Sequence, residues 1–182
     1  MKKCIGLLLV ILACSFTQAQ SEDRGYIVKV GDEAPDIELL FPDGTKKQLK
    51  DLRGKIVMLQ FTASWCGVCR KEMPFIEKDI WLKLKGNSKF ILFGIDLKES
   101  KETVEKFAKE TKITYPLLLD PEGKAFYAFA AQGAGVTRNV IIDDNGKIVF
   151  MTRLYDKKEF DEMVKVINQL LKKKQTDTTK DR

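Results

Sequence analysis

The chain has 182 residues, of which 44% are hydrophobic, and its formal net charge at pH 7 is +6. This length and composition fit one packed globular domain rather than a disordered chain. The sequence contains no histidine, which excludes a Ser–His or Cys–His catalytic pair and any His-ligated zinc or copper site. Because the basic excess lies in tails and helices, such as Lys172–Lys174, without interleaved aromatic residues, we expect no nucleic-acid partner.

Residues 1–19 have the pattern of a secretory signal peptide. Lys2 and Lys3 form a short positive region, and a mostly aliphatic stretch too short for a permanent membrane span runs from Ile5 to Ala13. Thr17–Ala19 offers small residues at the two positions that a signal peptidase reads. We therefore expect cleavage after Ala19 and a periplasmic or otherwise extracytoplasmic protein.

The cysteine count depends on this processing. Of the 4 cysteines, Cys4 and Cys14 lie in the signal, so a chain that begins at Gln20 keeps only Cys66 and Cys69. Without further cysteines for a disulfide framework, this pair is either one local bridge or a redox site, and it is too small for a tetrahedral zinc site. In the alternative processing route, the residues before Cys14 act as a lipobox, and a lipid on Cys14 anchors the protein to the membrane.

We expect a polar, flexible leader over residues 20–27, one domain over residues 28–174 and a polar tail over residues 175–182. Turn chemistry and hydrophobic periodicity predict the elements of the first half. In chain order these are a hairpin of residues 37–40 and 46–49, a strand buried on both faces over 56–61, an amphipathic helix over 66–84 with a kink at Pro74, and a second buried strand over 90–97.

The second half continues the alternation of helices and strands. Its expected elements are a helix over 101–110, a short strand over 116–119, a helix over 124–131, a hairpin of 139–143 and 147–151, and a closing helix over 157–173. Strands that alternate with helices and end in an antiparallel hairpin predict an α/β fold, in which a mixed central β-sheet is flanked by helices.

The run Trp65-Cys66-Gly67-Val68-Cys69 stands between the first buried strand and the following helix. This junction places Cys66 at the helix N-terminus, where the amide dipoles favour a thiolate, and Cys69 one turn further in, where burial disfavours it. Two thiols at this spacing can close into a disulfide and reopen by thiolate attack, so the predicted chemistry is thiol–disulfide exchange. Since histidine is missing, activation of Cys66 is left to the helix dipole, the neighbouring thiol, and Arg70 or Lys71.

These features together resemble thioredoxin-fold proteins of the TlpA/ResA type, within the group shared with peroxiredoxins. The resemblance covers about residues 30–173. Val30–Asp36 resembles that family's opening motif, Gly54–Phe61 its first core strand, Trp65–Pro74 its active site and Ile141–Val149 its late hairpin. It implies a thioredoxin-like fold with an N-terminal β-hairpin extension, and a protein-disulfide oxidoreductase that needs no cofactor beyond its cysteines.

By this resemblance, Cys66 is the nucleophile and Cys69 the resolving thiol. The buried acid of thioredoxin has its match at Gln60, which cannot ionise, whereas an acid matching Glu72 takes the proton of the inner thiol in ResA-type proteins. Glu72 follows Cys69 by one helical turn, so we expect it near that thiol. Our hypothesis is that Glu72 accepts the proton; in the alternative it is an exposed helix carboxylate. The residues expected to contact the substrate are Trp65, Gly67, Val68, Val136 and Thr137.

Two positions depart from the family pattern. The dipeptide between the cysteines is Gly67–Val68 rather than Gly-Pro, and the position where the fold usually has a cis-proline falls near Thr137. We expect backbone groups of Thr137 to dock an extended substrate there.

The predicted function is an exported oxidoreductase that reduces protein disulfides and draws electrons from an upstream donor in the membrane. A peroxiredoxin-like thiol peroxidase is a second candidate, suggested by Thr137–Arg138. Its motif fits poorly, because Thr62 stands four residues before Cys66 rather than three and residue 59 is leucine. A non-catalytic binding module with a permanent Cys66–Cys69 bridge is a third.

Overall fold

The computed structural model describes residues 24–180. The expected signal peptide, including Cys4 and the alternative lipidation site Cys14, lies outside the described residues. None of the helices in the described part of the chain combines the length and apolar character needed to cross a membrane.

The centre of the fold is a seven-stranded mixed sheet with the strand order β2-β1-β5-β4-β3-β6-β7. Strands β5, β4 and β3 run parallel, whereas β6 is antiparallel to β3, β7 to β6, and β1 to both β5 and β2. In chain order the strands are β1 (Glu38–Leu40), β2 (Lys46–Gln48), β3 (Ile56–Thr62), β4 (Phe90–Leu97), β5 (Leu117–Asp120), β6 (Arg138–Ile142) and β7 (Ile148–Arg153). The expected mixed sheet and N-terminal hairpin are confirmed.

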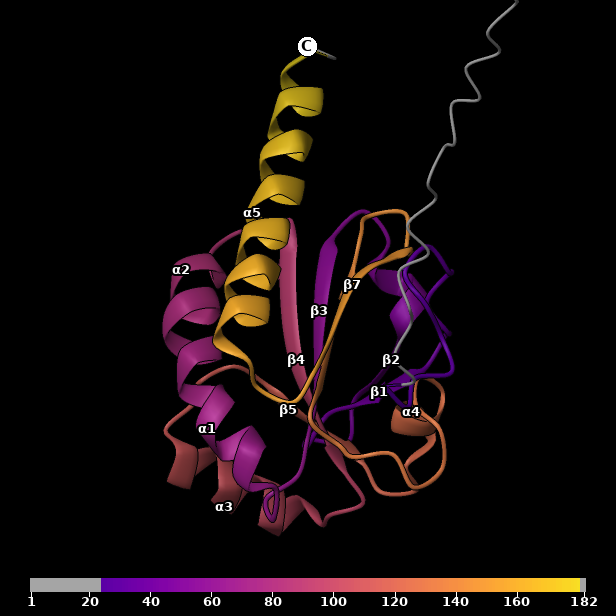
Figure 1. Cartoon of the computed structure of the whole chain (residues 1–182), viewed down its shortest axis with the longest axis vertical. Coiled ribbons are helices and arrows are strands. Elements are labelled where there is room, and N and C mark those ends of the chain that lie inside the picture. Colours follow the sequence, from indigo (N-terminus) through magenta and orange to yellow (C-terminus); the bar gives the residue numbers. More distant parts are fainter. Residues whose placement is uncertain (1–23, 181–182) are drawn as a thin grey trace, which may run out of the picture.

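Helices cover both faces of this sheet (Figure 1). On one face lie α1, α3 and α5, and Arg70 of α1 stacks on Phe107 of α3 with 4.8 Å between the guanidinium carbon and the ring centroid. On the other face lies α4, where Phe126 and the following Phe129 pack against Phe61 of β3. The helical elements are η1 (Leu49–Leu52), α1 (Gly67–Ile76), the π-helical turn η2 (Glu77–Trp81), α2 (Leu82–Leu84), α3 (Lys101–Thr111), α4 (Lys124–Tyr127) and α5 (Lys157–Lys180).

The helix expected over 66–84 is present but not uniform. It passes through Pro74, which lacks an amide donor, and widens soon afterwards into the π-helical turn Glu77–Trp81. In this turn the carboxylate of Glu77 accepts hydrogen bonds from the Thr114 amide (2.8 Å) and hydroxyl (2.6 Å), which ties the helix to the loop before β5.

The helix expected over 124–131 ends early, at Tyr127. The residues after it pair with the N-terminal segment instead: the amide of Ile27 donates to the Phe129 carbonyl, and the amide of Ala131 donates to the Gly25 carbonyl. Strand-like pairing with a distant segment therefore ends the helix before the boundary that local sequence favours.

The ordered fold also begins upstream of the expected boundary at residue 28. Arg24 forms an ion pair with Glu159 of α5 at 2.5 Å. The hydroxyl of Tyr26 donates to the Thr152 carbonyl at 2.6 Å, and its ring lies under the guanidinium of Arg138. Residues 24–27, expected to be flexible leader, therefore pack on the sheet near the start of β6.

Candidate active site

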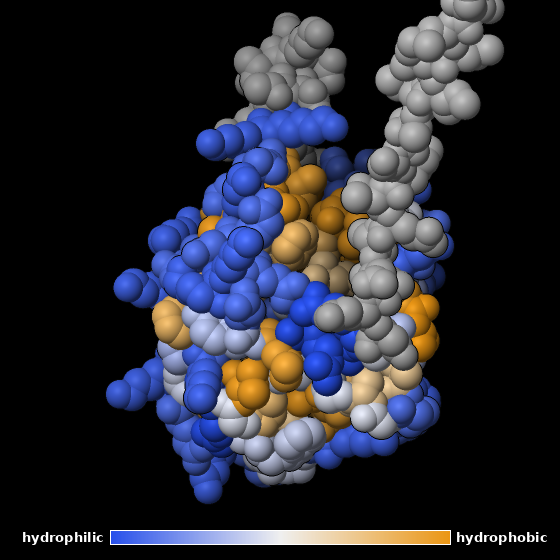
Figure 2. Space-filling model, viewed as in Figure 1, coloured by the Kyte–Doolittle hydropathy of each residue, from blue (hydrophilic) through white to orange (hydrophobic). Residues whose placement is uncertain are grey.

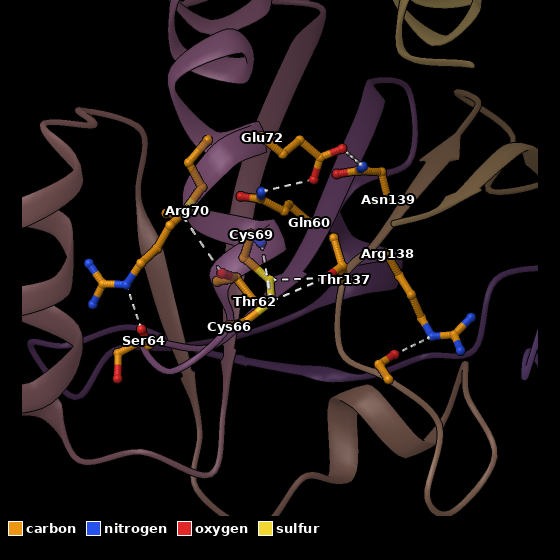
Figure 3. Close-up of a disulfide and its surroundings, with 12 residues drawn as sticks. Gln60, Thr62, Ser64, Cys66, Cys69, Arg70, Glu72, Thr137, Arg138 and Asn139 are labelled. Carbon is orange, nitrogen blue, oxygen red and sulfur yellow. Dashed lines mark hydrogen bonds between the residues drawn. A yellow bond between two sulfur atoms is a disulfide. The ribbon is translucent and has the colours of Figure 1, made fainter. Parts of the chain in front are cut away.

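The two cysteines lie at the start of α1, just after the end of β3 (Figure 3). Cys66 is the N-cap of α1 and is joined to Cys69 by a disulfide. The amide of Cys69 donates to the Cys66 sulfur at 3.2 Å, so the helix N-terminus directs a donor at this sulfur. Cys66 is 7% exposed and Cys69 is fully buried. The expected order of exposure is confirmed, although even the outer sulfur is largely covered.

Thr137 lies opposite the disulfide, just before β6. Its hydroxyl oxygen is 3.1 Å from the Cys66 sulfur and 3.3 Å from the Cys69 sulfur. The backbone is held as well, because the amide of Leu154 donates to the Thr137 carbonyl at 3.1 Å. The position that the sequence assigns to the usual cis-proline therefore faces both sulfurs, and here it presents a hydroxyl group.

The other residues expected to contact the substrate differ in how exposed they are to solvent. Trp65 is 67% exposed, Gly67 is exposed and Val68 is half-buried. Val136 is 3% exposed, so, unlike Trp65, it presents no surface to a partner chain.

Glu72 is buried on the inner side of α1, so the alternative of an exposed helix carboxylate is wrong. Its carboxylate accepts hydrogen bonds from the side-chain amides of Asn139 at 2.7 Å and Gln60 at 3.5 Å. Burial raises the pKa of Glu72 to about 7, although these two donors act in the opposite direction. In the view of Figure 3 the carboxyl is directed at Asn139, and Gln60 lies between it and the sulfurs.

The Glu72 site continues into a buried polar network. Tyr115 donates its hydroxyl to Gln60 at 2.6 Å, and Asn139 also donates to the Thr152 hydroxyl at 2.8 Å. Sequence reasoning missed Asn139 and Tyr115. Asn139 directly precedes the apolar run Val140–Ile142. This polar residue in a predicted buried strand was the signal that could have identified it.

Two arginines, Arg70 next to Cys69 in sequence and Arg138 next to Thr137, are directed away from the sulfurs (Figure 3). Arg70 donates to the Ser64 carbonyl at 2.7 Å and to the Glu110 carboxylate at 3.0 Å. Arg138 is buried and donates through Nε to the Gly135 carbonyl at 3.0 Å. The expectation that Arg70 activates Cys66 is therefore wrong, because long-range partners fix its guanidinium elsewhere, and Lys71 is exposed on the helix surface.

The turn before Cys66 is held by an acidic residue that the sequence did not reveal. The carboxylate of Glu99, after β4, accepts from the Ser64 amide and hydroxyl, both at 2.5 Å. Next to it in the fold is Asp96, which is fully buried and whose carboxyl oxygens meet no N–H or hydroxyl donor within residues 24–180. Burial and the neighbouring Glu99 raise the pKa of Asp96 to about 8. Among the described residues, no group of acidic or cysteine side chains is arranged to hold a metal ion.

We predict that Asp96→Asn makes stability less dependent on pH. An unfolded aspartate ionises near pH 4, whereas folded Asp96 keeps its proton to about pH 8. The folded state thus binds an extra proton between these values, and stability falls as pH rises through this window. The advantage of the variant over wild type in unfolding free energy should grow by roughly 1–3 kcal/mol from pH 5 to pH 8. Urea denaturation measures it.

The control for this prediction is Asp161→Asn, which changes an exposed carboxylate of α5 paired with Lys157. Its effect should stay small across the same pH range, because exposed ion pairs contribute little. A flat difference between Asp96→Asn and wild type from pH 5 to pH 8 would contradict the assignment of a proton to buried Asp96.

Comparison with known proteins gives consistent matches over the same region. The Redoxin family model matches residues 29–171. The thiol-disulfide oxidoreductase ResA of Geobacillus thermodenitrificans is 32% identical over 147 residues, which cover 80% of this chain and 82% of that relative. The solution structure of a candidate protein disulfide isomerase from Bacteroides thetaiotaomicron is 59% identical with a TM-score of 0.78, covering 81% of this chain and 93% of that one.

A thiol:disulfide interchange protein from Bacteroides sp. is more distant, at 25% identity and a TM-score of 0.65, over 78% of this chain and 91% of that one. These relatives share the thioredoxin fold, and the cysteine pair lies at the start of α1 in this chain. The chain therefore belongs to the Redoxin family, and it is a protein-disulfide oxidoreductase.

Proposed function

We propose that this protein is an exported reductase of protein disulfides, in which Cys66 attacks the substrate and Cys69 resolves the mixed disulfide. The observation that carries the proposal is the asymmetry of the two sulfurs. Cys66 lies at the helix N-terminus with 7% of its surface exposed, whereas Cys69 is fully buried one turn inward. A partner chain can reach only the first of them.

The reaction moves two electrons from the dithiol to the substrate. The Cys66 thiolate attacks one sulfur of the substrate disulfide; a mixed disulfide forms, the substrate bond breaks, and the leaving sulfur takes a proton from water. Cys69 then passes its proton to Glu72, the base tested below, and attacks the Cys66 sulfur. The Cys66–Cys69 bond forms, the mixed disulfide breaks, and the second substrate thiol is released after protonation by water. An upstream dithiol donor at the membrane restores the reduced pair.

The orientation of the two arginines near the site supports the reducing direction. Arg70 and Arg138 are engaged elsewhere, so the Cys66 thiolate has an amide and a hydroxyl near it rather than a positive side chain. Strong stabilisation of the reduced form is what makes a dithiol pair oxidising. A partly buried sulfur with only neutral donors is therefore expected to give its electrons away.

The surface beside the site suits a protein substrate. Figure 2 shows exposed apolar residues beside α1, where the chain passes from β7 into α5. Leu154 and Phe75 lie in this region with 43% and 38% of their surfaces exposed, and Phe75 stacks on Tyr155. Trp65, beside Cys66, is a further exposed apolar side chain. The amide of Leu154 donates to the carbonyl of Thr137, so this region adjoins the residue that faces the sulfurs.

Export rests on the signal-like segment of residues 1–19, and an oxidising compartment is where a disulfide substrate persists. The peroxidase alternative is less favoured, because neither Arg70 nor Arg138 turns its guanidinium toward Cys66 (Figure 3).

We predict that Cys69→Ser traps the mixed disulfide. With the resolving thiol removed, Cys66 attacks an oxidised protein such as insulin and remains bound to it, because serine cannot displace the substrate. Non-reducing electrophoresis and mass spectrometry measure the adduct. Cys66→Ser is the matched variant and should give at least about tenfold less adduct, since Cys69 is buried. Equal trapping by both variants would contradict the assigned roles, and no trapping by either would favour a structural disulfide.

We further predict that Glu72 accepts the proton of Cys69 during resolution. The carboxylate is ionised only as pH rises through about 7, so resolution in wild type should accelerate through the same range. Glu72→Gln should slow resolution about 100-fold and remove this inflection, because a positioned general base contributes about this much. Stopped-flow measurement of substrate release from the mixed disulfide, from pH 5 to pH 9, tests it.

The control is Glu77→Gln, one turn further along the same helical run. This carboxylate is also buried but binds Thr114, so its variant should lose stability and keep the wild-type pH profile. Superimposable profiles for wild type and Glu72→Gln would contradict the role of Glu72.

A further inference from the structure

The inference concerns the hydroxyl group of Thr137 and rests on the proposed function. In the oxidised protein neither sulfur carries a hydrogen, so the hydroxyl is the donor in both contacts, at 3.1 Å to Cys66 and 3.3 Å to Cys69. Every hydrogen bond of this hydroxyl within the described chain goes to one of these two sulfurs.

The hydroxyl is also held in place before any reaction occurs. Thr137 is 3% exposed, and a β-branched side chain has few rotamers available. Its backbone is fixed by the bond from the Leu154 amide and by the start of β6 at Arg138, which pairs with Phe61 of β3. A donor fixed in this way loses little freedom when it binds a charged sulfur.

Disulfide sulfur is a weak acceptor, whereas a thiolate is a strong one, and hydrogen bonds to charged groups stabilise more than neutral ones. The hydroxyl therefore interacts more strongly with the reduced, ionised pair than with the disulfide. Because it reaches both sulfurs, rotation about one side-chain bond is enough to follow the negative charge from Cys66 during attack to Cys69 during resolution.

We propose that Thr137 is a catalytic residue whose hydroxyl donates a hydrogen bond to whichever active-site sulfur carries the negative charge. It transfers no proton; the proton of Cys69 still leaves to the base. In this site the hydroxyl takes the place of a cationic partner, since Arg70 and Arg138 are turned away. It also sets how reducing the pair is, because it favours the reduced state.

The test is Thr137→Val, which keeps the shape of the side chain and removes the donor. The midpoint of the pH dependence of Cys66 alkylation by iodoacetamide should rise by about one pH unit, the loss expected for one hydrogen bond to a charged group. At pH 8 the equilibrium with glutathione should shift up to about tenfold toward the protein disulfide, which corresponds to about 30 mV.

Two further variants separate the hydroxyl from the shape of the site. Thr137→Ser restores the donor and should return both values close to wild type. Thr62→Val removes another buried hydroxyl beside the site, one that contacts the Met73 sulfur at 3.8 Å rather than the disulfide, and should leave both values unchanged. Should Thr137→Val not fold, Thr137→Ala is compared with Thr137→Ser in the same assays.

The inference is overturned if Thr137→Val titrates like wild type, if Thr137→Ser shifts as far as Thr137→Val, or if Thr62→Val shifts equally. These outcomes are separate from failure of the proposed function. Alkylation requires only a reduced Cys66, so a protein that titrates as expected but never reduces protein disulfides contradicts the function alone. A protein that reduces them with an unchanged Thr137→Val titration contradicts only the role of the hydroxyl.

Discussion

Burial of β3 on both faces is the constraint on which the rest of this structure depends. All seven of its residues are buried, so both strand edges need hydrogen-bonded neighbours and both faces need cover. Parallel β4 and antiparallel β6 supply the edges. Because β6 runs opposite to β3, the start of β6 lies at the end of β3, where α1 begins. Thr137 thereby meets Cys66 and Cys69, although it is about seventy residues away in sequence.

The same burial determines the acid–base properties of the site. Burial raises the pKa of Glu72 to about 7, and its two amide donors, Asn139 and Gln60, only partly oppose this rise. A carboxyl with such a pKa can exchange protons near neutrality, whereas a solvated glutamate is already ionised. Asp96 is likewise buried, and its carboxyl faces Glu99 rather than an amide donor in the described part of the chain. A raised carboxyl pKa in the folded state makes stability fall as pH rises through that pKa, so both groups link the stability of the fold to pH.

Local sequence patterns predicted many of the secondary-structure elements of this protein. The buried strands, the late hairpin and the cysteine pair at a helix N-terminus followed from periodicity and turn chemistry, which depend on neighbouring residues. The early end of α4 did not, because it depends on pairing with residues 25–27, a hundred positions away. The orientation of Arg70 likewise depends on distant Glu110. Asn139 and Asp96 stood in apolar runs, where spacing alone does not tell a buried polar partner from an exposed residue.

In the proposed function, Cys66 and Cys69 form a redox-active pair that gives electrons to protein disulfides. The most direct measurement is the reduction potential of this pair, obtained by trapping thiols after equilibration in thiol–disulfide buffers and reading the mass shift. Neutral donors and a partly buried sulfur predict a midpoint near that of thioredoxin, about −270 mV. A midpoint near that of DsbA, about −120 mV, would make the protein an oxidant. A pair that stays oxidised in every buffer while the protein is folded would contradict the account altogether.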